Sequence, residues 1–171
     1  RILGSTVAHG NIKNIDTSKA LALPGVVCVI TGADVPDIKY GVSPARYDEH
    51  VLAKGRVRHV GEGVAAVAAV DEETADRALK LIEVEYEELP ALLSPEEAIK
   101  DGAPQLHEGE RFKNNISTKV DHHFGDIEQG FREADYIREE TFTGNHTYQS
   151  PMEPHASIAY WERNDTLILY T

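Results

Sequence analysis

The sequence predicts an α+β fold, and the observations that predict it are concentrated in residues 51–93. An apolar run at 64–70 is short enough to be a buried strand. It leads directly into an amphipathic helix pattern that begins at Asp71, a natural N-cap residue. From Ile82 onward apolar residues alternate with glutamates, which is the period of a half-exposed strand. A buried strand, a capped helix and a second strand therefore follow one another with almost no loop.

The residues before this block predict two more strands and one short helix. Residues 11–15 have a strand pattern, and Asp16 can cap a helix that ends at Pro24-Gly25. Residues 26–30 are mostly β-branched and predict a buried strand. Cys28 lies inside this strand pattern, and we expect it to be a small core residue rather than a ligand or a nucleophile.

The residues after the block begin with a capped helix and a polar segment. Ser94-Pro95-Glu96-Glu97 is a capping box with proline at the first helical position, and it predicts a helix over 95–100. Residues 102–115 are polar and rich in turn formers, which is typical of a linker. Beyond it, Asp126 and Gln129 form a second capping box, and four segments have strand patterns: 116–124, 137–143, 156–162 and 166–170. Asn164-Asp165 indicates a hairpin turn between the last two.

Composition and charge exclude several classes of partner. Acidic residues outnumber basic ones 29 to 17, which gives a formal net charge of −12. Such a surface is repelled by phosphate backbones and anionic lipids, so neither nucleic acid nor a membrane is an expected partner. The apolar runs are too short for a transmembrane helix, and no signal peptide is visible. With a single cysteine, these features fit a cytoplasmic protein.

Three groups of residues could carry chemistry, and each has a simpler interpretation. Gly61-Glu62-Gly63 precedes a strand and not a helix, which favours a tight turn over a phosphate loop. His122 and His123 would point to opposite faces of a strand, so a surface pair is expected. Glu153 and His155, with His146 nearby, could bind a metal, but a hydrogen-bonded polar corner is the favoured interpretation. No motif of a nucleophilic hydrolase or a nucleotidase is present.

Two blocks of sequence resemble one known family, and they occur in that family's order. Residues 51–93, VLAKGRVRHVGEGVAAVAAVDEETADRALKLIEVEYEELPALL, are similar to the α/β hammerhead region of the large subunit of molybdenum hydroxylases, the xanthine dehydrogenase and aldehyde oxidoreductase family. Residues 125–135 (GDIEQGFREAD) and 151–160 (PMEPHASIAY) resemble the same proteins further along. The resemblance implies a hammerhead domain over 1–110, followed over 111–171 by the first strands and helix of a molybdopterin-binding domain, which is left incomplete.

The resemblance also implies a cofactor set and a set of partners. The parent enzyme would hold molybdenum–molybdopterin and pass electrons through iron–sulfur clusters to FAD on partner domains or subunits. The family's GGGFG-type loop, its substrate-loop arginine and its catalytic glutamate lie further along, so we assign no catalytic residue, cofactor ligand or metal ligand here. The polar and aromatic loop that contains Arg46 and Tyr47 would lie near the substrate funnel. Within the family, the sequences YGVSP and 51–93 resemble the 4-hydroxybenzoyl-CoA reductase α subunit most. Purines, aldehydes, nicotinate and carbon monoxide remain alternative substrates.

Two functions remain as hypotheses at this point. The chain is expected to be an N-terminal fragment of the molybdopterin-binding subunit, structural and funnel-lining, with no cofactor bound and no activity by itself. The alternative is a free-standing hammerhead module that binds or scaffolds without redox chemistry. A gene that continues past Thr171 into a GGGFG loop would favour the first hypothesis.

Overall fold

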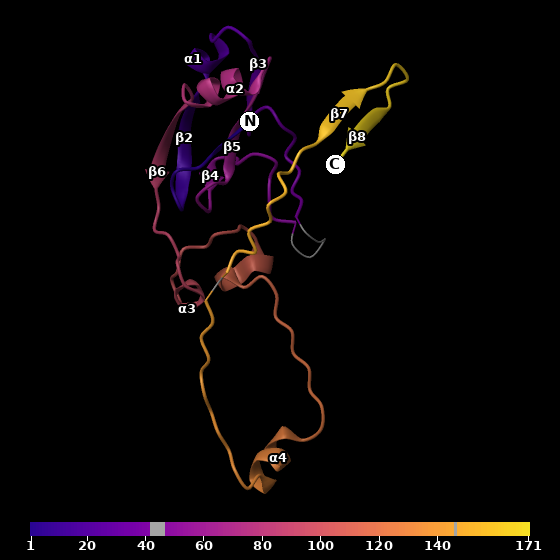
Figure 1. Cartoon of the computed structure of the whole chain (residues 1–171). Coiled ribbons are helices and arrows are strands. Elements are labelled where there is room, and N and C mark those ends of the chain that lie inside the picture. The colour runs from indigo at the N-terminus through magenta and orange to yellow at the C-terminus, as the bar shows by residue number, and fades with distance from the viewer. Residues whose placement is uncertain (42–46, 146) are drawn as a thin grey trace. The chain divides into compact units, whose positions relative to one another are not determined.

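The computed structural model describes residues 1–41, 47–145 and 147–171 (Figure 1). The chain divides into two compact units, Arg1–Asp121 and His122–Thr171. The first unit is an α+β arrangement, and the second contains one helix and one β-hairpin.

The first unit contains two antiparallel sheets of three strands. In one sheet the central strand β5 (Gly63–Ala69) lies between β1 (Ile2–Gly4) and β3 (Val26–Thr31). Ala66 of β5 is paired with Ile2 on one side and with Ile30 on the other. The apolar run predicted to be a strand therefore forms one, and the structure places it at the centre of a sheet.

The second sheet is built around β2 (Gly10–Asp16), which lies between β4 (Arg56–Val57) and β6 (Glu83–Glu88). Figure 1 shows β2 and β6 as the long antiparallel pair of this unit. In β6 the glutamates are exposed and the alternate residues Val84 and Tyr86 are half-buried. The period-two pattern therefore gave the correct element and the correct solvated face.

Short helices cover the first sheet. α2 (Glu72–Leu79) contacts β5 and β3, and α1 (Ser18–Leu21) contacts β3 and α2. The core between them consists largely of small residues, which allow helix and sheet backbones to approach closely. Its buried members are Ala20, Ala65, Val67, Ala75, Ala78 and Ile82.

The helix starts that were predicted from capping residues are confirmed. The Asp71 side chain accepts a hydrogen bond of 2.7 Å from the Thr74 backbone N–H at the start of α2. Ser94 does the same for Glu97 at 3.2 Å, at the start of α3 (Pro95–Ala98). Each cap satisfies a backbone donor that the first helical turn leaves without a partner.

The second unit contains one helix and one hairpin. α4 (Ile127–Glu133) begins after Asp126, whose side chain accepts from the Gln129 backbone N–H at 2.9 Å, as the capping box predicted. β7 (Ile158–Trp161) pairs with β8 (Leu167–Tyr170) in an antiparallel hairpin. Asp165 takes a positive φ of 59° in the turn, which tight hairpin turns require. Both final strands and their turn were predicted.

The prediction that Cys28 is a core residue is wrong, because its side chain is exposed. β3 is an edge strand, and its register with β5 shifts between Val26 and Cys28. Such a bulge breaks the strict alternation of faces. Both Cys28 and its neighbour Val27, which is 71% exposed, consequently face solvent.

Two of the predicted strands are not formed in the part of the chain that the structure describes. Residues 116–124 and 137–143 have no regular secondary structure and belong to no sheet. A strand is held by hydrogen bonds to a neighbour, so an apolar, β-branched segment stays irregular where no neighbour is present. The pattern in these segments indicates a propensity that no partner within the described chain satisfies.

The segment predicted to be a linker is attached to the first unit. Residues 110–115 form a short 3-10 element, η2 (Glu110–Asn115), interrupted by non-helical residues. The side chain of Asn115 donates to the carbonyl of Ala98 at 2.9 Å and to that of Pro104 at 3.0 Å. The compact unit consequently runs to Asp121. The predicted boundary between the hammerhead domain and the molybdopterin-binding domain, after residue 110, is a separate matter and stays a prediction.

Candidate functional site

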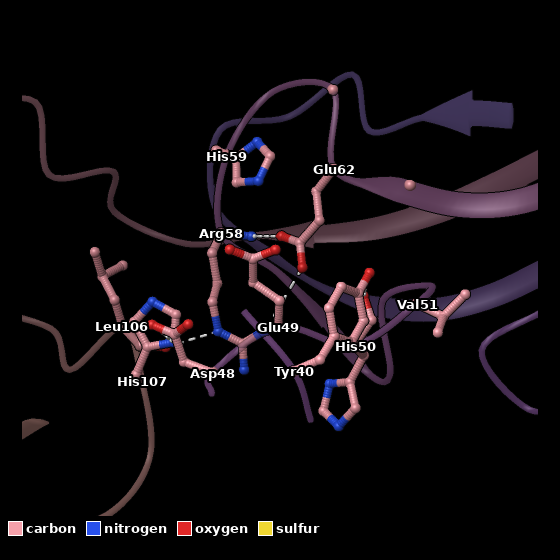
Figure 2. Close-up of a pocket in the computed structure, with 12 residues that line it drawn as sticks. Tyr40, Asp48, Glu49, His50, Val51, Arg58, His59, Glu62, Leu106 and His107 are labelled. Atoms are coloured by element: carbon pink, nitrogen blue, oxygen red, sulfur yellow. Dashed lines mark hydrogen bonds and ion pairs between the residues drawn. The ribbon is translucent and has the colours of Figure 1, made fainter. Parts of the chain in front are cut away.

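A cavity of about 370 Å³ with many polar lining residues lies in the first unit, beside the loop that precedes Val51 (Figure 2). Three parts of the chain line it: the loop ends around Tyr40 and His50, the turn between β4 and β5, and the segment after α3. Its charged or titratable lining residues are Tyr40, Asp48, Glu49, His50, Arg58, His59, Glu62 and His107.

The turn between β4 and β5 is shaped by its glycines. Gly61 takes a φ of +87°, which is left-handed and costs little only for a residue without a Cβ. Its N–H donates to the carbonyl of Ser5 at 2.8 Å, and the Ser5 N–H donates to the carbonyl of Glu62 at the same distance. The Gly-Glu-Gly motif is thus a tight turn locked onto the end of β1, which matches the interpretation favoured from the sequence.

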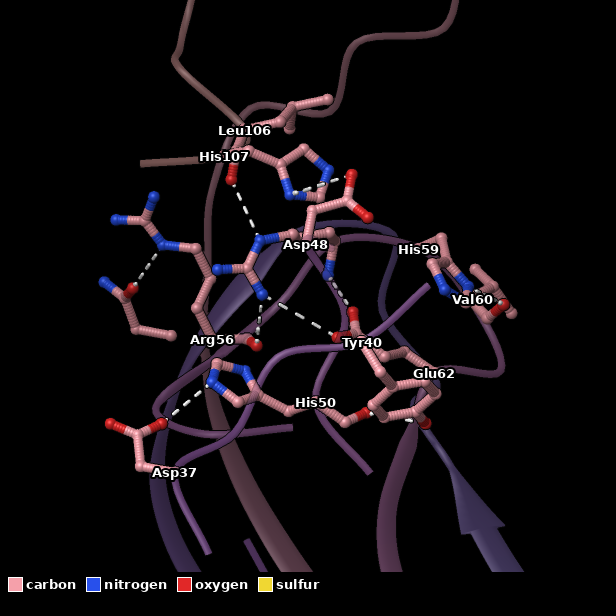
Figure 3. A network of polar contacts seen from close by, with 12 residues as sticks. Asp37, Tyr40, Asp48, His50, Arg56, His59, Val60, Glu62, Leu106 and His107 are labelled. Carbon is pink, nitrogen blue, oxygen red and sulfur yellow. Dashed lines mark hydrogen bonds and ion pairs between the residues drawn. The ribbon is translucent and has the colours of Figure 1, made fainter. Parts of the chain in front are cut away.

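Arg58 is the most heavily bonded side chain in the cavity wall. Its Nε donates to the carbonyl of Leu106 at 2.9 Å, and a terminal nitrogen lies 3.7 Å from a Glu62 carboxylate oxygen. The other Glu62 oxygen accepts from the Arg58 backbone N–H at 2.5 Å. Because only 12% of the Arg58 side chain is exposed, its charge needs these partners to stay buried. Figure 2 shows the Arg58 side chain together with its partners Glu62 and Leu106. Figure 3 shows the surrounding polar contacts, in which Asp48 lies beside His107 and Asp37 lies beside His50.

The loop on the other side of the cavity is closed by backbone and side-chain contacts. Tyr40 and Glu49 form an isolated antiparallel bridge, with N–H to carbonyl distances of 2.9 and 3.0 Å. The Tyr40 hydroxyl donates to the carbonyl of His50 at 3.2 Å. The His50 ring nitrogen Nε2 lies 2.9 Å from an Asp37 carboxylate oxygen. The two ends of the loop are therefore fixed relative to each other.

His107 reaches the same loop from the segment after α3. Its Nδ1 lies 3.8 Å from an Asp48 carboxylate oxygen, and its ring packs on Phe112 with centroids 5.4 Å apart. Burial lowers the pKa of His107, and the nearby Arg58 and Lys39 cations lower it further, against the opposing effect of Asp48. The ring is consequently held in its neutral form to a lower pH than a free histidine.

The contacts among these side chains hold together the loops that line the cavity. Among the described residues, no group of three or more histidine, cysteine or carboxylate side chains is placed to hold a metal ion. The Glu62 carboxylate is engaged by Arg58, and Asp48 is close to His107.

The funnel role predicted for the loop that contains Arg46 and Tyr47 stays a prediction, and sequence reasoning did not name the residues that organise the neighbouring cavity. Tyr47 is described and half-exposed, next to Asp48 at the cavity edge, whereas Arg46 lies outside the described residues. Arg58, Glu62 and His107 were not predicted as site residues. The only available signal was the four-residue spacing of Arg58 and Glu62 around a turn, because the approach of His107 depends on the tertiary fold.

The described histidines of the second unit, His122, His123 and His155, are exposed. His122 stacks on Phe124 with ring centroids 6.5 Å apart, and His123 also has an interaction. Glu153 and His155 are both exposed, and His146 lies outside the described residues. A ligand site at these last three positions therefore stays a hypothesis.

None of the helices in the described ranges is long and apolar enough to cross a membrane.

Two family models match the chain, one after the other. The model for the aldehyde oxidase and xanthine dehydrogenase a/b hammerhead domain matches residues 1–90. The model for the molybdopterin cofactor-binding domain matches residues 106–171. The first match lies within the first unit, and the second runs from residue 106 through the second unit, in the order that the sequence resemblance implied.

Similar curated proteins are much longer than this chain. A probable hypoxanthine oxidase of Escherichia coli O157:H7 is 35% identical over 209 aligned positions, covering 99% of this chain and 22% of the relative. A probable xanthine dehydrogenase subunit of Bacillus subtilis is 37% identical, with the same coverage of both. The solved aldehyde oxidoreductase of Desulfovibrio gigas matches with a TM-score of 0.83 and 30% identity, over 99% of this chain and 19% of that protein.

The chain thus spans about a fifth of the length of these relatives. Its two sheets with covering helices correspond to the hammerhead match, and its helix and hairpin lie inside the molybdopterin-domain match. The chain therefore belongs to the xanthine dehydrogenase and aldehyde oxidoreductase family of molybdenum hydroxylases, as a part of the large subunit that carries the hammerhead domain and the beginning of the molybdopterin-binding domain.

Proposed function

We propose that this chain is part of the molybdopterin-binding subunit of a molybdenum-dependent oxidoreductase. The observation that carries the proposal is the succession of the two family matches, 1–90 and 106–171, in one chain. A hammerhead module used for another purpose would have no reason to be followed by a molybdopterin-domain sequence. When bound, the molybdenum cofactor would supply the redox chemistry, and residues beyond this chain would hold it.

Within that enzyme the chain would have a structural and funnel-lining role. The loop that contains Arg46 and Tyr47 is the part proposed to lie near the substrate. Its flanking residues Tyr40 and Glu49 are bridged, and His50 is paired with Asp37. These contacts support the role because a loop that guides substrate must be held at its ends by a rigid scaffold.

The remaining partners and the location are proposed at the same level. Iron–sulfur and FAD domains or subunits would accept the electrons, and the rest of the large subunit would cover the second unit. A cytoplasmic location is supported by the single cysteine and by an acidic surface that does not favour membranes.

Only the names of the relatives reported above limit the range of substrates. Those names refer to hypoxanthine, xanthine and aldehydes. We propose a small carbonyl-containing or heteroaromatic compound as the substrate class. The local sequence similarity to the 4-hydroxybenzoyl-CoA reductase α subunit predicts an aromatic CoA thioester as substrate. This stays a prediction, and a reductive assay with such a thioester would test it.

The test uses the complete polypeptide that its gene encodes, together with any co-purifying subunits. Molybdenum and pterin are measured per polypeptide, and dye-linked oxidation is assayed with hypoxanthine, xanthine and an aldehyde. We expect stoichiometric molybdenum and turnover of at least one substrate. A gene without a further molybdopterin-binding segment, or a complete protein without molybdenum, would favour the free-standing module.

The funnel role has its own experiment. Arg46→Ala and Tyr47→Ala in the complete enzyme should raise KM more than they lower kcat, because the two residues would contact substrate on its way to the metal. Val27→Ala is the control, since Val27 is exposed on the edge strand β3. Kinetic constants equal to those of the unchanged enzyme would remove Arg46 and Tyr47 from the funnel and leave the family assignment untouched.

A further inference from the structure

A second cavity of the first unit, of about 240 Å³, is here called the His9 cavity. The chain before β2, the turn after β4 and the segment after β6 contribute to its wall. Most of its lining residues are apolar: Ala8, Val60, Ala91, Leu92, Leu93 and Leu106. His9, Arg58 and His59 complete the lining. The His9 cavity is therefore chemically unlike the polar cavity beside residues 47–50.

His9 is the buried polar residue of this cavity, with only 3% of its surface exposed. Its ring nitrogen Nδ1 lies 2.8 Å from the carbonyl oxygen of Pro90. A carbonyl oxygen only accepts hydrogen bonds, so Nδ1 carries a proton and donates it to this bond. In the neutral ring the other nitrogen, Nε2, is left with a lone pair and can only accept.

The acceptor nitrogen Nε2 is buried, and no donor among the described residues reaches it. Buried polar atoms in folded proteins nearly always have a hydrogen-bond partner, because an unpaired one has lost its hydration without compensation. The neighbouring polar side chains have other partners: Arg58 donates to the carbonyl of Leu106, and His59 Nδ1 lies 3.1 Å from the carbonyl oxygen of Val60. A partner for Nε2 must therefore come from outside the described chain.

The lining of the cavity indicates which kind of partner fits. A water molecule buried in a protein makes about three hydrogen bonds, and the apolar side chains that form most of this wall offer it none. An apolar cavity of about 150 Å³ is already large enough for a molecule of the size of benzene. A cavity of about 240 Å³ therefore has room for an aromatic ring. These features match a compact apolar molecule with one O–H or N–H donor, such as phenol.

Entry to the cavity requires a movement of side chains, because Nε2 exposes almost no surface. Val60 is 64% exposed and Leu93 is 86% exposed, so both side chains have few packing contacts to lose. Such side chains change rotamer at little cost. A ligand that displaces them would bury apolar surface of its own and of theirs, which favours binding.

We propose that the His9 cavity binds a small, free apolar molecule with one hydrogen-bond donor, of the chemical class that phenol represents, and that this donor binds to Nε2 of His9. The inference goes beyond the proposed function. The site involves neither Arg46 nor Tyr47 and does not depend on which substrate the parent enzyme oxidises.

Titration of the full 171-residue chain with phenol and with toluene tests the site, with the isotope-labelled chain followed by amide NMR. Toluene has nearly the same shape but carries a methyl group in place of the hydroxyl, so a purely apolar cavity would bind toluene more tightly than phenol. We expect phenol to bind more tightly than toluene. The amides that shift should be concentrated at 8–10, 58–60 and 91–93.

One variant separates the acceptor of His9 from its donor. In His9→Asn the side-chain amide can still donate to the Pro90 carbonyl, but the shorter side chain places no acceptor where Nε2 lies. The affinity for phenol should fall about fivefold, which corresponds to one lost hydrogen bond, and the affinity for toluene should not fall. His155→Asn, the same change at an exposed position of the second unit, is the matched control and should keep both affinities.

A second measurement does not depend on whether a variant folds. The NMR signal of the His9 Nε2 nitrogen in the unchanged chain should shift when phenol is added and stay in place when toluene is added. Equal or tighter binding of toluene, binding of neither compound, or phenol binding that leaves the Nε2 signal unchanged would each overturn the proposal.

The complete polypeptide distinguishes a free ligand from a cavity that the enzyme fills itself. Phenol should bind to the complete polypeptide as it binds to the chain, with the same loss of affinity in His9→Asn. Absence of phenol binding there would show that the remainder of the large subunit occupies the cavity, and would overturn the proposal of a free ligand. Neither result changes the family assignment.

Discussion

At the scale of single residues, the positions that mattered were those where one side chain satisfies a backbone group. Asp71 and Ser94 each accept a hydrogen bond from a backbone N–H three residues ahead, which is a local interaction. The spacing that creates it is visible in the sequence, and both caps were predicted. Arg58 satisfies two backbone carbonyls as well, but they belong to Arg56 and to the distant Leu106. No spacing in the sequence predicts the contact with Leu106.

Asp71→Ala should lower the urea midpoint of the first unit without changing the slope, because one orphan N–H of α2 loses its acceptor. Asp71→Asn should restore most of the loss, since asparagine caps about as well as aspartate. The Thr74 backbone N–H lowers the pKa of Asp71. The stability that Asp71 contributes is therefore present above the ordinary pKa of an aspartate carboxyl. It is lost as pH falls through the lower pKa of Asp71 in the folded state. Equal midpoints for all three proteins would contradict the cap.

At the scale of elements, the packing of β5 decides the stability of the first unit. Val64 is fully buried in this central strand, whereas Val27 of the edge strand β3 is 71% exposed. The two residues have the same side chain and the same strand propensity. Any difference between their substitutions therefore measures burial alone.

Val64→Ala should reduce the free energy of unfolding by about 2 kcal/mol, from two buried carbons at roughly 0.8 kcal/mol each and the cavity that they leave. Val27→Ala should change it by less than about 0.5 kcal/mol, as surface substitutions usually do. Urea titrations of the two variants measure both values. A loss of similar size in both variants would mean that β5 is not the centre of the core.

The contacts of residues 105–115 change where the chain is expected to be cut. Lys113 lies in η2, in the segment that is tied to the rest of the first unit by the bonds from Asn115 to Ala98 and from Arg56 to Gln105. Lys119 lies beyond this segment, exposed and outside any regular element. Limited trypsin digestion followed by mass spectrometry should therefore show cleavage after Lys119 before cleavage after Lys113. First cleavage after Lys113 would show that residues 105–115 open readily.

At the scale of the whole molecule, the second unit has apolar side chains without a core to bury them. The register of β7 and β8 puts Ile158, Tyr160, Ile168 and Tyr170 on one face of the hairpin. Trp161, Leu167 and Leu169 lie on the other face. A hairpin that is apolar on both faces is typical of the inside of a larger sheet that is covered on both sides. This is the environment that the rest of a molybdopterin-binding domain would provide.

Trp161, the only tryptophan of the chain and 69% exposed, reports on that environment. In this chain alone its fluorescence should be red-shifted and quenched by acrylamide about as efficiently as free tryptophan. In the complete protein its counterpart, isolated by replacing any other tryptophan, should be protected several-fold. Equal quenching in both would show that the hairpin is not covered by the remainder of the large subunit.

The chain by itself should also bind no cofactor. After expression with molybdenum supplied and after dialysis, we expect no stoichiometric molybdenum or pterin and no oxidoreductase activity, because the family's ligand loops lie elsewhere in its sequence pattern. Elemental analysis and pterin fluorescence check the expectation. Bound molybdenum at one atom per chain would contradict it.

The sequence by itself determined the features that depend on near neighbours. Caps, periods and the final hairpin turn involve residues a few positions apart, and these elements formed where they were predicted. The two resembling blocks were likewise enough to identify the family. Tertiary structure decided what depends on distant neighbours: the exposure of Cys28 at a bulged edge, the irregular course of 116–124 without a partner strand, and the approach of His107 to Asp48. The physical reason is that burial and pairing are properties of two surfaces, and a sequence pattern describes only one of them.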